Sequence, residues 1–263
     1  MSLVRPLIQE TMFKRIFTSA ALPVLLTMVM ASCSKMEQFK TELIKDYHPL
    51  EVGKYITYKL DSTVYVTLNT IKEVHTYIIQ DIVDAKITDN LGRDAYRIRR
   101  MIRSNTDTTQ WTDAASYLIV PNQHSLEVID NNLRFIKLQE PIKNDFTWKG
   151  NNYINTYTDA NLQYLDAWDY TYQGVAAPFT IPDATSFPET ITVKEKDDVL
   201  GNPGDKTFFW EIDHSLAVYA KGKGLVYREF LHEVWQPANI ESSNGYFEPN
   251  SYGIKLTFLN SNY

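Results

Sequence analysis

The sequence predicts an all-β protein: an antiparallel β-sandwich or open barrel that follows an N-terminal signal peptide and a short tether. Runs rich in β-branched and aromatic residues recur through most of the 263 residues, as is typical of strands. Turn-forming sequences such as Asp89–Gly92 and Gly201–Gly204 separate many of these runs. No amphipathic helix longer than the tether stands out. Many short strands at this spacing are typical of antiparallel sandwiches and barrels.

The first 32 residues have the charge and hydropathy order of a secretory signal peptide. Met12–Arg15 is a basic start, and Ile16–Met30 is an apolar run interrupted only by serine and threonine. This run has 15 residues, which is short of the roughly 20 that a membrane-spanning helix needs. Residues 1–11 lack signal character, so Met12 is an alternative start of translation. We expect residues 1–32 to be absent from the mature protein.

Cys33, the only cysteine of the chain, is the predicted lipid anchor. Its thiol can form a thioether with a diacylglycerol, and the small Ala31 and Ser32 leave room for a processing peptidase. Met30-Ala31-Ser32-Cys33 resembles the lipobox of bacterial lipoprotein signals, in which leucine usually occupies the position of Met30. The resemblance implies that Cys33 becomes the lipidated first residue and holds the protein at a membrane. A buried free thiol and an ordinary signal peptide cut near Cys33 are the alternatives.

The mature chain is acidic. Loss of residues 1–32 removes three basic residues and one acidic residue from a chain of 26 Lys+Arg and 32 Asp+Glu, which leaves a net charge near −8. Such a protein has no electrostatic reason to bind nucleic acid or anionic lipid headgroups. We therefore expect no nucleic-acid partner and attachment to the membrane through acyl chains alone. With a single cysteine there is no intrachain disulfide, so the domain depends on its core.

A lipidated tether at residues 33–45 is expected to precede one β-rich domain at residues 46–263. Met36, Phe39 and Leu43 are spaced like the apolar side of a short helix, and a flexible stalk is equally compatible. Strong alternation of apolar and charged residues marks the strand around Ile98. The expected strands are Lys54–Leu60, Ser62–Leu68, Val74–Thr88, Tyr96–Arg103, Ser116–Val120, Ser125–Ile129, Leu133–Leu138, Leu165–Tyr172, Thr190–Lys194, Thr207–Ile212, Leu225–Trp235 and Tyr252–Leu259.

Two further stretches carry a family resemblance. Tyr47–Tyr58 contains Pro-Leu, a spacer, glycine and a tyrosine-rich strand, and Tyr219–Val226 reads Tyr-Ala-x-Gly-x-Gly-Leu-Val. Both resemble uncharacterised Bacteroidetes-type outer-membrane lipoproteins. The resemblance implies one domain in the cell envelope, on either face of the outer membrane, and no particular activity. Gly222 and Gly224 do not form a dinucleotide loop because Tyr227 occupies the third glycine position. They predict a hairpin with positive φ angles.

The sequence predicts no catalytic residue, no metal ligand and no cofactor. The five histidines are dispersed and form no zinc-protease motif. Asp213-His214-Ser215 contains the residue types of a catalytic triad, but neighbours on a strand point to opposite faces. Asp197, Asp198 and Asp205 flank a turn without the regular spacing of a calcium loop.

The aromatic segment Phe146–Tyr172 contains the candidate ligand-binding residues Trp148, Trp168, Tyr170 and Tyr172. They interleave with asparagine and aspartate residues, and aromatic faces beside amides and carboxylates suit sugar rings. Trp168, Tyr170 and Tyr172 share one face if this segment is a strand. The alternative is that the aromatic side chains are inter-sheet core.

Three classes of function are compatible with these features. The first is a lipid-anchored cell-envelope protein without catalysis that binds a glycan, a peptide or a partner protein. The second is a structural or assembly component of the outer membrane. The third is a hydrolase whose site has no recognisable motif. The sequence does not indicate an oligomeric state.

Overall fold

The computed structural model describes residues 42–106, 110–240 and 244–263. The predicted signal peptide, Cys33 and most of the tether lie outside the described residues. The folded unit spans Thr41–Tyr263. About 60% of the chain is strand and 5% is helix, so the all-β prediction is confirmed.

The strands follow one another along the chain. They are β1 (Tyr55–Val66), β2 (Ile71–Thr88), β3 (Asp94–Ser104), β4 (Thr112–Pro121), β5 (Ser125–Asp130), β6 (Leu133–Gln139), β7 (Thr147–Lys149), β8 (Asp169–Thr180), β9 (Ser186–Leu200), β10 (Trp210–Ala220), β11 (Gly224–Gln236), β12 (Tyr246–Phe247) and β13 (Tyr252–Ser261). The two helical pieces are α2 (Ile44–Tyr47) and the 3-10 helix η1 (Ala160–Leu165), which lies in the connection between β7 and β8.

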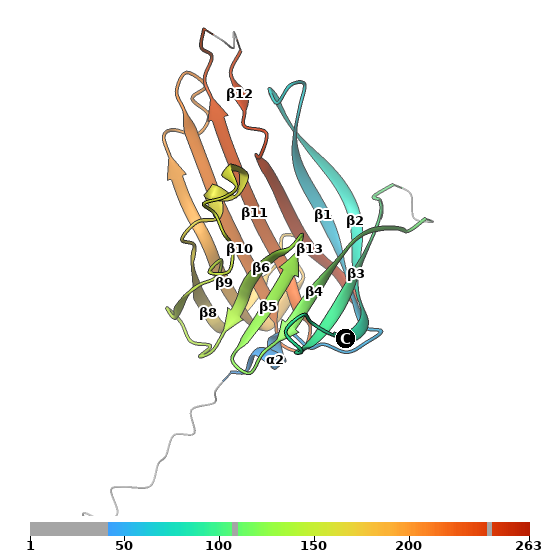
Figure 1. Cartoon of the computed structure of the whole chain (residues 1–263). Coiled ribbons are helices and arrows are strands. Elements are labelled where there is room, and N and C mark those ends of the chain that lie inside the picture. The colour runs from blue at the N-terminus through green and yellow to red at the C-terminus, as the bar shows by residue number, and fades with distance from the viewer. Residues whose placement is uncertain (1–41, 107–109, 241–243) are drawn as a thin grey trace, which may run out of the picture. The chain divides into compact units, whose positions relative to one another are not determined.

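All strands belong to one antiparallel sheet that is nearly closed into a barrel (Figure 1). Its order is β6-β5-β4-β3-β2-β1-β13-β11-β10-β9-β8-β7, and β12 pairs with β11. The sheet thus consists of two meanders, which meet where β1 pairs with the C-terminal β13. The barrel is the second of the two architectures that the sequence predicts.

The seam between the edge strands β6 and β7 is closed largely by side chains. One backbone hydrogen bond crosses it, from Ile136 N to Gly150 O at 2.8 Å. Trp148 donates its indole N–H to Ile136 O at 2.8 Å. Tyr172 donates its hydroxyl to Gln139 O at 2.8 Å and accepts a hydrogen bond from Gln139 N at 2.9 Å. Aromatic residues therefore satisfy an edge that would otherwise expose unpaired backbone groups.

One end of the barrel is covered by the segment that enters it (Figure 1). Ile44 and Tyr47 of α2 are buried, and Gly222 of the β10–β11 turn donates its backbone N–H to Asp46 O at 2.6 Å. The Tyr47 hydroxyl donates to Glu42, which also pairs with Lys221 at 2.7 Å. Residues 42–45, which we expected in the tether, therefore pack with the barrel.

Several strand boundaries differ from the prediction. The two expected strands between Lys54 and Leu68 form the single strand β1. The expected strand Leu165–Tyr172 contains the end of η1, and β8 begins only at Asp169. The expected strand Thr207–Ile212 begins at Trp210 because the preceding residues form the turn that connects β9 to β10. Gly222 and Gly224 have the expected positive φ angles, 72° and 103°.

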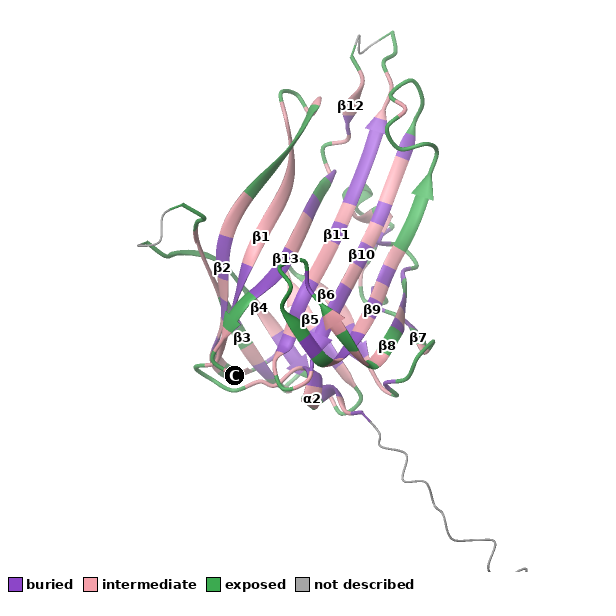
Figure 2. Ribbon diagram, turned by 180° about the vertical axis from the view of Figure 1, so that it is seen from behind, coloured by how far each residue is buried: buried purple, intermediate pink, exposed green. Residues whose placement is uncertain are grey.

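Buried residues continue along β11 almost to its end away from α2, whereas the corresponding ends of β2 and β9 are exposed (Figure 2). The largest core cluster joins the aromatic residues of β7 and β8 to aliphatic residues of β3–β6, β9 and β10. A second cluster packs β1, β2, β10, β11 and β13. A third, at the end opposite α2, is built on Trp210, Trp235 and Phe247.

Candidate functional site

The barrel encloses a cavity of about 130 Å³. Its walls come from β1–β6, β9–β11 and β13, so strands on all sides of the barrel contribute. Much of the wall is aliphatic, including Ile56, Val83, Ile98 and Leu256. Six acidic, lysine or arginine side chains also line it: Asp81, Arg100, Asp130, Lys137, Glu195 and Arg228. Charged groups are rare in protein interiors unless they are paired, so their pairing needs to be traced.

Asp81 and Arg100 form the first pair. The Arg100 guanidinium donates to both carboxylate oxygens of Asp81, at 2.7 and 2.6 Å. Tyr117 adds its hydroxyl to Asp81 at 3.0 Å, and its ring lies 5.3 Å from the Arg100 guanidinium carbon. A bidentate arginine–carboxylate pair of this kind is satisfied without a ligand.

Lys137 and Glu195 form the second pair, which is almost completely buried. Lys137 Nζ lies 2.9 Å from Glu195 Oε1 and 3.1 Å from the Tyr170 hydroxyl. Ser215 donates its hydroxyl to Glu195 at 2.7 Å. Burial lowers the pKa of Lys137 to about 8, against the opposing effect of Glu195. Burial would raise the pKa of Glu195, but Lys137 and Arg228 together hold it below its usual value.

Asp130 and Arg228 are the two charged groups of the wall without a hydrogen bond or ion pair of their side chains among the described residues, and of these Arg228 has a buried, unsatisfied atom. Among the described residues no hydrogen bond or ion pair reaches its guanidinium, and its Nε is buried and unsatisfied. Burial would lower the pKa of Arg228, but the charge of Glu195 raises it. The guanidinium therefore stays charged with unused donors beside a cavity. A buried polar group in this state costs free energy that a ligand could recover.

His48 lies where the cavity approaches the α2 end of the barrel. The residue lines both this cavity and a second hollow below it, which is also bordered by Ile44 and Tyr96. Its ring lies 6.1 Å from that of Tyr219. Burial lowers the pKa of His48 to about 4, so the ring is neutral near pH 7. Near pH 7, the uncharged ring of His48 therefore lies between the cavity and the second hollow.

The four aromatic candidates lie in the core. Trp148, Trp168, Tyr170 and Tyr172 are 5%, 1%, 0% and 0% exposed, which matches the core alternative and not an exposed platform. Trp168 precedes β8, and its indole N–H donates to Tyr164 O at 2.6 Å. Tyr170 alone of the four touches a cavity-lining charge, through its contact with Lys137. Trp148 and Tyr172 close the seam of the barrel, Tyr170 contacts Lys137, and Trp168 packs in the core.

The triad-like sequence Asp213-His214-Ser215 lies within β10, as expected. Asp213 and Ser215 are buried on the inner face, whereas His214 is partly exposed and lies near Asp197 at 3.4 Å. The three side chains therefore do not form a relay.

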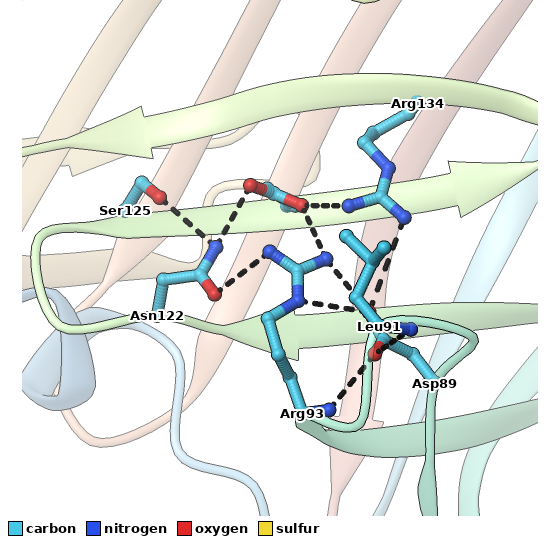
Figure 3. A network of polar contacts seen from close by, with 7 residues as sticks. Asp89, Leu91, Arg93, Asn122, Ser125 and Arg134 are labelled. Atoms are coloured by element: carbon cyan, nitrogen blue, oxygen red, sulfur yellow. Dashed lines mark hydrogen bonds and ion pairs between the residues drawn. The ribbon is translucent and has the colours of Figure 1, made fainter.

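A second cluster of polar side chains is joined by hydrogen bonds and ion pairs (Figure 3). Arg93 bonds both Asp89, at 2.7 Å, and Asn122, at 3.1 Å. The buried Glu127 accepts from Asn122 at 2.8 Å and from Arg134 at 2.7 Å. Arg93 lowers the pKa of Asp89 to about 2 through its hydrogen bonds. The cluster ties the β2–β3 turn to β5 and β6, and its buried polar side-chain atoms all have partners.

Comparisons with known proteins add no assignment. A scan against protein-family models finds no match, and a search of curated proteins finds no relative. Within the part of the chain that the structure describes, no helix has the length and apolar character needed to cross a membrane.

The cavity was not predicted from the sequence, although the sequence contains an indication of it. Arg228 alternates with Val226 and Phe230 on one face of β11, so a charge falls on an apolar face. Lys137 follows Phe135 at alternate positions of β6, and Glu195 follows the buried Val193 in the same way in β9. A charge at an inward position of a strand is a usable sign of an interior polar site.

Proposed function

We propose that this protein is a lipid-anchored cell-envelope protein that binds one small carboxylate inside its barrel. The observation that carries the proposal is Arg228, a charged guanidinium that lines the cavity with no hydrogen bond or ion pair among the described residues. The proposal for the anchor rests on the lipobox resemblance at Cys33.

The chemistry of the walls favours an anion with an apolar body. Arginine presents planar N–H donors that match a carboxylate. Electrostatic attraction is stronger in a site shielded from water than at the surface. The aliphatic side chains around Ile98 and Leu256 would cover the apolar part of such a molecule.

The size and charge of the cavity limit the ligand. A dry cavity of about 150 Å³ holds a benzene-sized molecule, and this one measures about 130 Å³. An oligosaccharide or a folded peptide segment does not fit. The six charged side chains of the wall sum to zero charge, which favours a monoanion over a phosphate dianion.

Calorimetric titration of the full chain with benzoate tests the proposal, and benzamide serves as the neutral match. Benzoate should bind and benzamide should bind at least tenfold more weakly. Arg228→Met should lower the benzoate affinity by about 10- to 100-fold, because a hydrogen bond to a charged group contributes about 1.5–3 kcal/mol. The control is Arg97→Met, which removes an exposed arginine paired with Asp84. Equal binding of the two compounds, or no loss in Arg228→Met, would refute the site.

The assembly function remains a second candidate because of a specific surface feature. Leu68, Phe208 and Ile240 are 93%, 68% and 105% exposed. They lie in loops at the end opposite α2, where Phe247 N donates to Asn69 O at 2.7 Å. Exposed apolar groups that gather at one end favour contact with a partner protein. Cross-linking in intact cells would test it: a triple change to serine should abolish a cross-linked species without altering benzoate binding.

A further inference from the structure

Two carboxylates and one imidazole meet on the inner face of the barrel, away from the carboxylate cavity. Glu211 and Asp213 lie on β10, and His232 lies on β11 directly opposite Asp213 in the register. Each of the three side chains can bring one ligand atom within 4.8 Å of the other two. None of the three lines the cavity described above.

One nitrogen of the His232 ring has a hydrogen-bond partner, and the other has none among the described residues. Its Nδ1 lies 2.7 Å from Asp213 Oδ1, and a carboxylate accepts, so Nδ1 carries the proton. The other nitrogen, Nε2, is then a bare lone pair. It is buried and has no partner among the described residues, in a side chain that is 1% exposed.

The surrounding residues hold the ring in place and leave a path to it. Tyr164 of η1 stacks on His232 with ring centroids 4.0 Å apart and planes at 14°. The Tyr164 hydroxyl in turn contacts that of Tyr252 at 3.2 Å. A groove of about 440 Å³ between η1 and β11 is lined by Tyr164, Glu211, His232 and Glu248. The groove gives solvent and ions access to the edge of the cluster.

The charges of this cluster lack a compensating cation. Among the described residues, no ion pair joins Glu211 or Asp213 to a lysine or an arginine, and the only such contact of Asp213 is with His232. Two neighbouring carboxylates beside an unused imidazole lone pair form an electron-rich set of donors. A cation that accepts nitrogen and oxygen ligands together would satisfy all three.

We propose that Glu211 and the Nε2 lone pair of His232 bind a divalent transition-metal cation, with Zn²⁺ as the best match, while Asp213 holds the ring through Nδ1. Zinc takes imidazole nitrogen and carboxylate oxygen as ligands, and water can complete its coordination. Calcium and magnesium prefer oxygen ligands alone, so the histidine argues against them. A carboxylate on the second ring nitrogen is also the usual way in which a metal-bound histidine is oriented. The groove supplies the open position for water or for a further ligand.

Zinc titration of the full chain by calorimetry tests this site. All variants carry Cys33→Ser, because a free thiol would bind zinc itself, and the protein bears no polyhistidine tag. After chelation, one Zn²⁺ per chain should bind. At roughly 100 times Kd it should raise Tm by about 5–10 °C. His232→Gln and Glu211→Gln should each weaken binding by about tenfold or more.

The matched control is His214→Gln. His214 lies on the same strand with two acidic neighbours, Asp197 at 3.4 Å and Glu229 at 3.5 Å, but it is partly exposed. This variant should bind zinc as the parent does. His232 is buried, so its replacement could prevent folding. Glu211→Gln is therefore the deciding variant, because its Tm in the absence of metal should equal that of the parent. No zinc binding by the parent, or unchanged affinity in Glu211→Gln, would overturn the proposal.

Discussion

At the scale of single residues, several charged side chains point into the interior of this barrel. Asp81 and Arg100 satisfy each other, as do Lys137 and Glu195, whereas Arg228 has no direct partner. Removing one member of a buried pair leaves an uncompensated charge, which is the expensive change. Arg228 differs because its guanidinium has no hydrogen-bonded or ion-paired partner among the described residues. Its replacement should therefore affect ligand binding more than folding.

Trp168→Ala should lower the free energy of unfolding by about 3–5 kcal/mol, because it removes a fully buried indole from the core. Trp168 is 1% exposed and stacks on Phe230 with centroids 6.1 Å apart. Chemical denaturation measures the loss. Tyr157→Ala in the same segment is the control, since Tyr157 is 88% exposed. A loss below about 1 kcal/mol in Trp168→Ala would mean that this side chain is not part of the core.

His48 should make the domain less stable in mild acid. Its folded-state pKa is lowered to about 4 by burial, whereas the unfolded chain has the ordinary value near 6.5. As pH falls from about 6.5 to 4, the unfolded state takes up a proton that the folded state does not, so the free energy of unfolding falls by at most about 3 kcal/mol. Above this window the group has no effect on stability, and below it no further loss follows.

His48→Asn should remove this part of the pH dependence while retaining a small polar side chain. The measurement is urea denaturation at a series of pH values from 7 to 4. His124→Asn, a change at an exposed histidine paired with Glu140, should leave the wild-type profile unchanged. An identical acid loss in His48→Asn and the wild type would contradict the assignment.

At the scale of elements, the seam between β6 and β7 is where the barrel depends on specific side chains. A short β7 of three residues cannot form a full ladder with β6. Trp148 and Tyr172 supply the missing hydrogen bonds. Gly150, directly after β7, leaves room for the Tyr170 ring of β8, because a Cβ at this position would come within 2.5 Å of that ring.

Gly150→Ala should destabilise the barrel by about 1–3 kcal/mol, the usual range for overpacking a core. The Tyr170 ring would have to move, and with it the hydroxyl that contacts Lys137. Thermal unfolding measures the effect, and hydrogen exchange at Ile136 would locate it at the seam. Lys149→Ala is the control: it removes an exposed ion pair with Asp169 and should change stability little. An unchanged Tm in Gly150→Ala would show that the seam can open without cost.

At the scale of the whole molecule, the proposed anchor decides where the barrel works. Cys33→Ser should abolish labelling of the protein by radioactive or alkyne-bearing acyl chains and leave an unprocessed precursor. Ser34→Ala is the control and should be labelled like the wild type. Labelling in cells followed by membrane fractionation tests both. Persistent acyl incorporation into Cys33→Ser would refute the lipoprotein proposal.

The sequence by itself determined the all-β class, most strand positions and the turns, because alternation and turn chemistry are local properties of the chain. It placed Val226, Phe230 and Arg228 on one face of a strand. It also misplaced the start of β8, because Leu165 at the end of η1 and Trp168 after it are residue types common in strands.

Only the tertiary structure decided which faces meet. Alternation shows that a strand has two faces but does not show which one points into a closed sheet. Lys137 and Glu195 are 58 residues apart, and barrel closure alone brings them beside Arg228. The same closure buries the aromatic residues of β7 and β8, which a sheet with an open edge would have exposed. The candidate sites follow from these long-range contacts, which no local pattern contains.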